Sequence, residues 1–512
     1  MRGILASSIG VTCAAALALP SAPPAAASAG TPVPVADAAT RTAGTAEVPA
    51  DVPGSTRSLP LRPLTHDRAS GAVLGLTPRT VPAFSLLGVV WDDPSAALHG
   101  RVQVRTRAAG TGEWSGWQDV ETHYTEHGAD PDTAEAASGQ VRGATAPLWV
   151  GESDGVEARV LPESGEPEGR PGDVDPVDTG SGEEQSGGEE QSGGEGASGG
   201  EGAGETDGVS ALPAGLRLDL VDPGEAEPDP GKAEPDPGKA EPDPGEAEPA
   251  DGAEAPRTGA MTAGAKAASA ANSALAPLGA TEIPALTAEE TREELVTLRG
   301  TELTEQQQAT PYIGPRPAIV TRHGWGADES LREKKFAYTS KVKAAFVHHT
   351  ASGNGYSCSQ APSLIRGFYR YHTKSLGWRD IGYNFLVDKC GRIYEGRAGG
   401  VAEPVKGAHT LGFNSRTTGI AVIGSYGSKN PPSKAVKAVA RLTAWKLGLH
   451  GMNPKAKTSL TSAGGNLYAK GKKVKMKVIS GHRDGVNTSC PGGKLYKKLS
   501  SVRSEAAGYQ GR

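Results

Sequence analysis

The chain has 512 residues, of which 37% are hydrophobic and 5% aromatic, and it contains 70 glycines and 39 prolines. This composition, with no Phe, Trp or Tyr between Trp149 and Tyr312, excludes a single large enzyme that fills the whole length. Residues 312–512 hold 34 Lys and Arg against 9 Asp and Glu, a balance of +25, and the remainder carries −31. So basic a C-terminal region favours polyanionic surroundings such as nucleic acid, acidic cell-wall polymers or an anionic membrane.

The first 29 residues have the features of a secretory signal. Arg2 supplies a positive start, a mostly small and apolar stretch extends to Leu19, and Ala-Ser-Ala at 27–29 is an A-x-A-like cleavage site. The alternative is a membrane anchor, but the run is short and rich in Pro and Ala for a span of ~18 or more apolar residues. We therefore predict a protein that is secreted, extracellular or cell-wall associated, with no membrane span.

Cysteine usage agrees with export. Cleavage after the signal removes Cys13 and leaves Cys358, Cys390 and Cys490. An odd number of cysteines in a secreted protein requires a reason for the spare thiol. The economical arrangement is one disulfide, Cys358–Cys390, acting as a structural staple, with Cys490 held by something else.

After a predicted linker over residues 30–80, residues 81–221 are predicted to form a small all-β, sandwich-like domain. Phe84–Trp91 is an apolar, β-prone run, and Arg101–Arg107 alternates with period two as a half-buried strand does. Further short strands, separated by Gly and Asp turns, are expected at Trp114–Trp117, Leu148–Val150, Val156–Val160 and Leu216–Leu220. The Gly-, Glu- and Ser-rich residues from about 162 to 212 are then a disordered insertion within the domain.

Residues 222–311 are predicted to be a disordered acidic and Ala-rich linker. The seven-residue repeat Ala226-Glu-Pro-Asp-Pro-Gly-Lys232 carries two prolines, which forbid a helix and favour an extended spacer. Thr287 and Glu290 form a capping-box pattern before a short helix that ends near Gly300. Because the spacer is acidic and the C-terminal domain basic, one hypothesis is that the spacer docks on that domain and inhibits it.

Residues 312–512 are predicted to form an α/β domain with a mixed central sheet, because apolar strands alternate with helical patterns. Strands are expected at 342–347, 383–387, 419–423 and 474–479, and helices around 364–371 and 436–447. The order of these elements places several polar side chains directly after strands.

Two of these strand ends carry potential metal ligands. The strand over 344–347 runs directly into His348 and His349, and the strand that ends at Ile479 leads to His482, with Cys490 beyond it. Two imidazoles and a thiolate form a three-ligand zinc set that leaves the fourth position for water, as in catalytic sites. Coordination also accounts for the odd cysteine. The alternatives are that each His is a surface or capping residue and that Cys490 is an inert buried thiol.

Several sequence stretches together carry a family resemblance. They are Arg322-His-Gly-Trp-Gly326, Phe346-Val-His-His-Thr350, Gly377-Trp-Arg-Asp-Ile-Gly-Tyr-Asn-Phe385, Ile393-Tyr-Glu-Gly-Arg397, Gly407-Ala-His-Thr-Leu-Gly-Phe-Asn414, and Ser480-Gly-His-Arg-Asp484 with Thr488-Ser-Cys-Pro-Gly492. In order and spacing, residues 316–503 resemble the zinc-dependent N-acetylmuramoyl-L-alanine amidases that share a fold with peptidoglycan recognition proteins, above all the long secreted actinobacterial forms. The Trp-rich β segment resembles the N-terminal region of those same proteins, without an activity to carry over.

The resemblance implies roles for individual residues. His348, His482 and Cys490 fall on the three zinc ligands of the family, whereas His349 falls outside the metal shell. Tyr383 falls on a tyrosine that assists catalysis, and the Thr488 hydroxyl would help to hold the substrate or transition state. Further residues that would line the substrate groove are His372, Trp378, His409 and Asn414.

The activity implied is that of a secreted peptidoglycan hydrolase, in which zinc-activated water cleaves the amide between N-acetylmuramic acid and L-alanine of the stem peptide. Family members that lack the cysteine ligand bind peptidoglycan without cutting it, so a non-catalytic recognition protein is the first alternative. A basic nucleic-acid or anionic-polymer module is the second, and secretion favours wall polymers over nucleic acid. We expect a monomer whose partners are peptidoglycan and anionic cell-wall polymers.

Overall fold

The computed structural model describes residues 54–65, 73–163, 212–225, 262–276 and 280–512. Three predicted segments lie outside the described residues: the signal, most of the insertion and the Pro-rich repeat. The hypothesis that the acidic spacer docks on the basic domain concerns these residues and therefore stays a prediction. The described residues belong to one compact unit, which contains both a β domain and an α/β domain.

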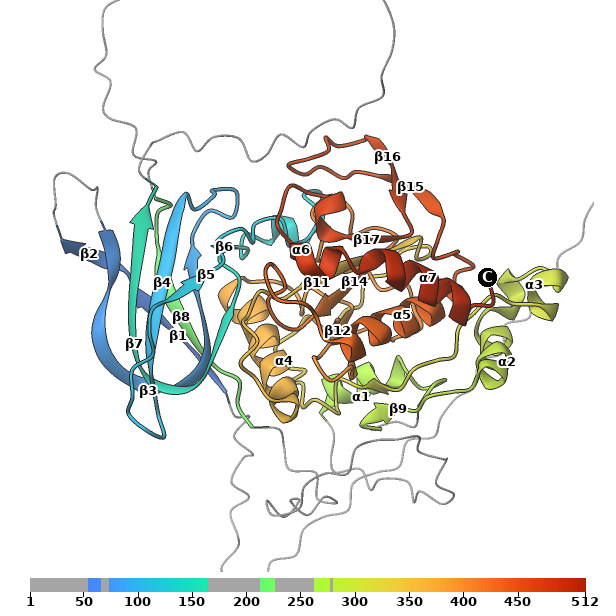
Figure 1. Ribbon diagram of the computed structural model, residues 1–512, viewed down its shortest axis with the longest axis horizontal. Helices are drawn as coiled ribbons and strands as arrows, with labels where there is room; N and C mark the ends of the chain where they lie inside the picture. The colour runs from blue at the N-terminus through green and yellow to red at the C-terminus, as the bar shows by residue number, and fades with distance from the viewer. Residues whose placement is uncertain (1–53, 66–72, 164–211, 226–261, 277–279) are drawn as a thin grey trace, which may run out of the picture. The chain divides into compact units, whose positions relative to one another are not determined.

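The β domain is built on antiparallel strands (Figure 1). They are β1 (Ser55–Pro60), β2 (Arg62–Thr65), β3 (Val73–Trp91), β4 (Gly100–Ala108), β5 (Gln118–Val120), β6 (Gly143–Ala144), β7 (Leu148–Pro162) and β8 (Arg217–Asp222), with one short 3-10 helix, η1 (Ala136–Ser138). The strand order is β1-β8-β3-β7-β4-β5, with β2 and β6 paired to β3. Towards the end of β7 the alternate residues Val156, Ala158 and Val160 are buried in the core, whereas Glu157 and Arg159 between them are partly exposed. The all-β prediction is confirmed.

The boundaries of this domain differ from the prediction. Residues 55–65 and 73–80, predicted as linker, form β1, β2 and the start of β3, because β1 pairs along its full length with β8 from the far end of the domain. All strands join one continuous sheet rather than two separate ones, and the register of β3 against β7 shifts at several bulges. Trp114 makes only an isolated bridge to Arg107, and β5 begins later than predicted, at Gln118.

The α/β domain is built on a seven-stranded mixed sheet, as predicted. Its strands are β9 (Glu282–Ile283), β10 (Ile319–Val320), β11 (Ala344–His349), β12 (Phe385–Val387), β13 (Ile393–Glu395), β14 (Thr417–Val422) and β17 (Ile479–Gly481), in the order β17-β11-β14-β12-β13-β10-β9. β11 pairs in parallel with both β14 and β17, whereas β12 and β13 are antiparallel. The predicted strand at 474–479 is divided between β16 and β17.

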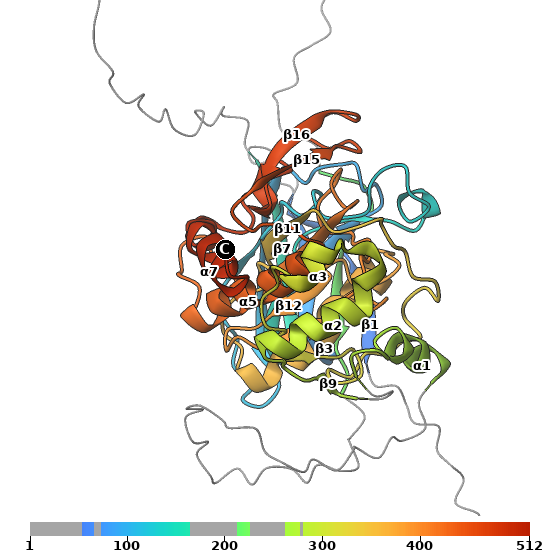
Figure 2. The ribbon, with the colours of Figure 1, turned by 90° about the vertical axis from the view of Figure 1, so that its right-hand side faces the viewer.

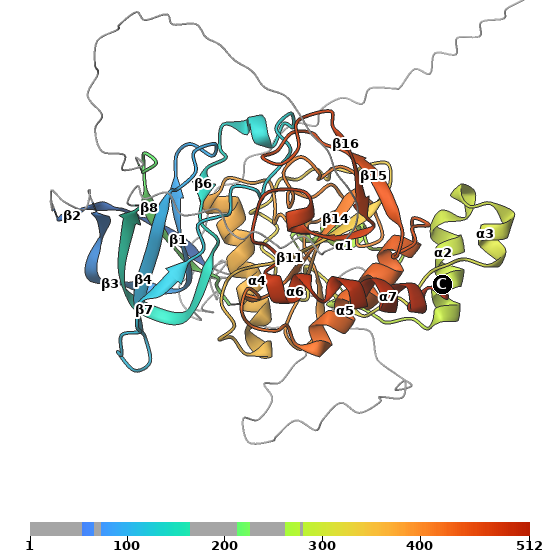
Figure 3. The same cartoon turned by 45° about the horizontal axis from the view of Figure 1, so that its top comes forward.

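Helices cover both faces of this sheet (Figure 1). α5 (Ser433–Gly448) and α7 (Leu499–Tyr509) share a core with Phe385 and Val387 of β12, whereas α4 (Ala361–Arg370) shares one with Leu386 on the opposite face. This division follows from the alternation of side chains along a strand. The remaining elements are η3 (Cys358–Gln360), the π-helical turn η4 (Tyr371–Ser375), η5 (His482–Asp484), α6 (Gly493–Tyr496) and the separate hairpin β15 (Lys457–Thr461) and β16 (Lys473–Lys477), visible in Figure 3.

The predicted disulfide between Cys358 and Cys390 is present. It joins η3 to the turn that follows β12, so it acts as a staple within the α/β domain. No helix in the described part of the chain combines the length and the apolar character needed to cross a membrane.

Part of the predicted linker belongs to the α/β domain. α1 (Ala263–Ala270), α2 (Ala288–Arg299), η2 (Gly300–Glu302) and α3 (Glu305–Ala309) precede Tyr312 and face the viewer in Figure 2. Leu275, Ile283 and Leu295 are buried in the main core, which is the physical reason that this segment folds. The Thr287–Glu290 capping box at the start of α2 is confirmed.

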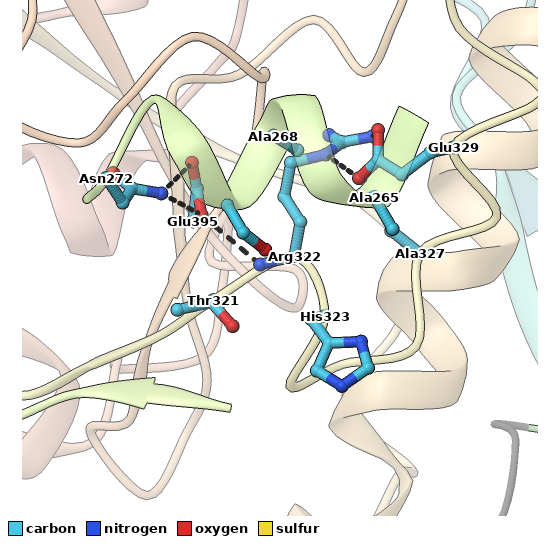
Figure 4. A pocket seen from close by; sticks show the side chains of 10 residues that line it. Ala265, Ala268, Asn272, Thr321, Arg322, His323, Ala327, Glu329 and Glu395 are labelled. Atoms are coloured by element: carbon cyan, nitrogen blue, oxygen red, sulfur yellow. Dashed lines mark hydrogen bonds and ion pairs between the residues drawn. The ribbon is translucent and has the colours of Figure 1, made fainter. Parts of the chain in front are cut away.

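A buried polar network fixes α1 to the sheet (Figure 4). Arg322, only 1% exposed, donates from Nε to Glu329 at 2.6 Å and from Nη1 to Asp380 at 3.1 Å. Asn272, just after α1, donates to both carboxylate oxygens of Glu395 at 3.0 and 3.1 Å. The arginine of the Arg-His-Gly-Trp-Gly stretch is therefore a structural residue that holds three chain segments together.

Candidate metal centre

The parallel pairing of β11 and β17 positions two histidines at one edge of the sheet. Ala345 pairs with Ile479 and Val347 with Gly481, so the carboxyl ends of the two strands coincide. His348 is the penultimate residue of β11, and His482 follows β17 as the first residue of η5.

Cys490 reaches the same point from the loop beyond η5. Its Sγ lies 3.9 Å from His348 Nδ1 and accepts a hydrogen bond from the His349 backbone N–H at 3.4 Å. The structure thus brings together the three residues predicted as metal ligands. The His349 ring points elsewhere, because its Nδ1 accepts from the backbone N–H of Tyr426 at 3.1 Å.

A fourth donor, His127, comes from the β domain. Ligand atoms of His127, His348, His482 and Cys490 all lie within 4.8 Å of one another, and all four residues are buried. Among the described residues, neither ring nitrogen of His127 or of His482 has a hydrogen-bond partner. Buried polar atoms are normally paired, so this convergence of unpaired nitrogens beside a thiol fits a bound metal ion. Three imidazoles and one cysteine are a donor set of the kind that tetrahedral zinc takes.

Burial controls the protonation of these donors. It lowers the pKa of His348 and of His482 well below the usual range, with further lowering by the neighbouring imidazoles, and it lowers the pKa of His127 to about 3. The three rings are therefore neutral and keep a lone pair for a metal. Burial raises the pKa of the Cys490 thiol, so a positive charge at this point would favour its thiolate.

Tyr383 and His409 lie next to the donors. The Tyr383 ring centroid is 5.4 Å from that of His348, and burial raises the pKa of Tyr383, which keeps its hydroxyl protonated as a hydrogen-bond donor. His409 Nδ1 is 3.3 Å from His348 Nε2, a contact that orients the His348 ring.

The other residues predicted at the site differ in their surroundings and contacts. His372 and Trp378 stack with ring centroids 4.5 Å apart near Tyr383. Asn414 accepts from the His409 backbone N–H at 2.7 Å, but its amide donates to Gly128 O of the β domain at 2.8 Å. The hydroxyl of the partly exposed Thr488 accepts from Cys490 N–H at 3.3 Å, which shapes the turn that carries the cysteine.

Sequence reasoning missed the contribution of the β domain. His127 and Tyr124 belong to the stretch between β5 and β6, which has no strand periodicity to draw attention to it. The available signal was His123-Tyr-Thr-Glu-His127, two imidazoles in a short acidic stretch. No local pattern predicts that this stretch meets residues more than 200 positions away.

Two known protein families match separate parts of the chain. Residues 37–185 match a family described as "Rv3811 N-terminal galactose-binding domain-like", and residues 338–493 match "N-acetylmuramoyl-L-alanine amidase". The peptidoglycan-recognition protein SC2 of Drosophila simulans is 31% identical over 181 residues, which are 35% of this chain and 84% of that protein. The chain belongs to the peptidoglycan recognition protein and N-acetylmuramoyl-L-alanine amidase family.

Other family members extend this comparison. A human protein named N-acetylmuramoyl-L-alanine amidase is 32% identical over 188 residues, which are 36% of this chain and 28% of the human one. Among solved structures, Drosophila PGRP-LB is 27% identical and covers 36% of this chain and 92% of its own, with a TM-score of 0.28. In the present chain, the region that matches the amidase family contains His348, His482 and Cys490, whereas His127 lies in the region that matches the other family.

Proposed function

We propose that the protein is a secreted, zinc-dependent N-acetylmuramoyl-L-alanine amidase that cleaves the amide bond between N-acetylmuramic acid and the L-alanine of the peptidoglycan stem peptide. The observation that carries the proposal is the convergence of buried His348, His482 and Cys490 beside the Tyr383 ring. The amidase match over the same residues and the name of the human relative support it. Export through residues 1–29 and action as a monomer are part of the proposal.

Each residue at the centre has a role in this chemistry. His348, His482 and Cys490 would hold the zinc ion, and the contact with His409 orients the His348 ring. Zinc bound there supplies Lewis-acid polarisation of the scissile carbonyl and activates the attacking water. The protonated Tyr383 hydroxyl donates to the oxyanion that develops on the carbonyl oxygen.

Substrate contacts come from residues around the metal donors. His372, Trp378, His409, Asn414 and Thr488 supply stacking surfaces and hydrogen-bonding groups for the muramoyl peptide. The basic surface of the α/β domain would attract anionic cell-wall polymers and concentrate the enzyme on the wall.

A non-catalytic peptidoglycan-binding protein is the second candidate. Many of the relatives are named recognition proteins, and with His127 the centre offers four potential protein ligands. A zinc site with four protein ligands has no position for water, which is the arrangement of structural sites.

The test is prolonged digestion of purified peptidoglycan by the full-length, zinc-loaded protein, with mass spectrometry of the products. We expect free stem peptides with L-alanine at the amino end, lost on chelation and restored by zinc. Cys490→Ser should abolish their release, and Ser489→Ala, at the exposed neighbouring position, should not. Retention of the protein on intact peptidoglycan, with no peptide released by wild type or by any variant described below, would make it a recognition protein.

A further inference from the structure

The stretch between β5 and β6, residues 121–142, lies across the α/β domain at the metal centre; we call it the β5–β6 segment. Its backbone is bonded to that domain near both ends. Leu411 N–H donates to Glu126 O at 3.0 Å, and Arg142 N–H donates to Leu376 O at 3.1 Å. The segment is therefore docked through its main chain as well as through its side chains.

Tyr124 occupies the surroundings of the proposed catalytic tyrosine. Its hydroxyl lies 2.7 Å from His372 Nε2 and 3.4 Å from the Tyr383 hydroxyl. Its ring stacks on His127 at a centroid distance of 4.3 Å and lies nearly parallel to Trp378 at 6.4 Å. The segment thus places an aromatic ring and a hydroxyl where the proposed function requires the substrate to bind.

Two buried carboxylates anchor the segment. Asp130 Oδ1 accepts from Asn414 Nδ2 at 2.9 Å and from the Gly412 N–H at 3.0 Å, and its Oδ2 forms an ion pair with Lys406 at 3.1 Å. Glu135 accepts two hydrogen bonds from Arg397, at 2.8 and 3.0 Å. Each of these bonds is strengthened by the charge of the carboxylate, and in the contacts with Lys406 and Arg397 both partners are charged.

Charge complementarity between the two domains agrees with these contacts. The β5–β6 segment contains five Asp and Glu residues and one Arg, and it lies on the α/β domain, whose residues 312–512 carry a net charge of +25. The docking hypothesis drawn from the sequence concerned the acidic spacer, which lies outside the described residues. The acidic part that the structure places there is the β5–β6 segment of the β domain.

We propose that His127 is a fourth protein ligand of the metal and that the β5–β6 segment holds the enzyme in a latent state. The proposal rests on the proposed amidase function. With four protein ligands the position for water is taken, and Tyr124 and Asp130 cover the groups that the substrate needs. Catalysis then requires the segment to leave the groove, which frees the fourth position and the Tyr383 hydroxyl together.

The first test measures ligation directly, in full-length protein loaded with Co²⁺. His127→Ala should change the visible ligand-field spectrum, because a solvent molecule replaces an imidazole, and should speed loss of the metal to a chelator by ~10-fold or more. His123→Ala is the matched control, since the His123 side chain is 70% exposed and, among the described residues, bonds only to Glu121. A wild-type spectrum and release rate in His127→Ala would overturn the ligand assignment.

The second test loosens the segment without touching a metal donor. The double variant Asp130→Asn with Glu135→Gln should bind an N-acetylmuramoyl peptide in metal-free form ~10-fold or more tightly than wild type, because the groove is open more often. Urea unfolding verifies that both proteins are folded. Equal affinity of wild type and the double variant would overturn the latent state.

Peptide release separates this inference from the proposed function. If both hold, the double variant releases stem peptides faster than wild type, by about the same factor as the gain in affinity. If the protein is no amidase, no variant releases peptides, yet the cobalt spectra and the affinities still respond. If the segment does not inhibit, wild type and the double variant release peptides at equal rates.

Discussion

The ion pair between Glu135 and Arg397 offers a quantitative test of how firmly the β domain is docked. Both side chains are nearly buried, with 8% and 7% of their surface exposed, and two hydrogen bonds join them. Burial by itself would raise the pKa of Glu135, but the Arg397 guanidinium outweighs it, so this pKa lies below its usual value and the pair is charged at neutral pH.

Substitution Glu135→Gln leaves the Arg397 charge buried without its counter-ion. Removing one partner of a buried pair typically costs ~3–5 kcal/mol. Glutamine keeps the shape of the side chain and one acceptor oxygen, so we expect a cost at the lower end of this range, about 3 kcal/mol of docking free energy. Because each 1.4 kcal/mol is a factor of ten, the segment should open ~100-fold more often.

Hydrogen–deuterium exchange measures this opening at the amides of Leu411 and Arg142, whose acceptors lie across the domain contact. Both should exchange ~100-fold faster in Glu135→Gln, while amides of β11 keep their protection. The matched control is Asp132→Asn in the same segment, because the Asp132–Lys470 pair is 61% and 68% exposed. Exposed pairs contribute about 0–1 kcal/mol, so this control should change exchange by less than ~5-fold. Equal exchange in the two variants would refute the reasoning.

Three further predictions concern the α/β domain. Cys490→Ser should weaken zinc binding by more than ~100-fold in competition with a chromophoric chelator, since it removes the thiolate donor. Arg322→Ala should lower the free energy of unfolding in urea by about 3–5 kcal/mol, against at most ~1 kcal/mol for Arg379→Ala, whose ion pair is partly exposed. Burial raises the pKa of Glu395 from 4.5 to about 7. The contribution of Glu395 to the free energy of unfolding is therefore full below pH 4.5 and is lost as the pH rises through 7. Glu395→Gln should flatten this pH dependence of the free energy of unfolding, measured by urea titrations across that range.

The parts of the site that the sequence predicts are those set by local order. His348 follows a buried run of β residues, and His482 follows another, so parallel pairing of the two strands suffices to bring the side chains together. For Cys490, the odd number of cysteines gave a second reason to predict a metal ligand. The disulfide followed from the cysteine count, the mixed sheet from the alternation of apolar strands with helical patterns, and the α2 capping box from the local Thr287–Glu290 pattern.

The parts that were not predicted depend on contacts between distant segments. Ser55–Pro60 reads as linker because its Pro- and Ser-containing sequence has little β propensity, and only the ladder with β8 makes it a strand. In the same way the burial of Ile283 and Leu295 decides the fold of a segment whose composition resembles a spacer. His127 is the extreme case, since its partners lie in another domain and nothing near it in the sequence reveals them.

The division of the four donors between two domains has a thermodynamic consequence for the proposed ligation. If docking of the β5–β6 segment strengthens metal binding by some factor, metal binding must strengthen docking by the same factor. Among the described residues neither ring nitrogen of buried His127 has a partner in the docked state, and a metal bound through one of them would remove the cost of that one nitrogen, ~1–3 kcal/mol. If the proposed ligation holds, zinc would favour the closed arrangement, and a substrate would open it only when its own binding free energy exceeds that coupling. An enzyme built in this way would hold its metal most firmly while it is latent. It would expose the fourth coordination position only where the local concentration of substrate is high enough to displace the β5–β6 segment.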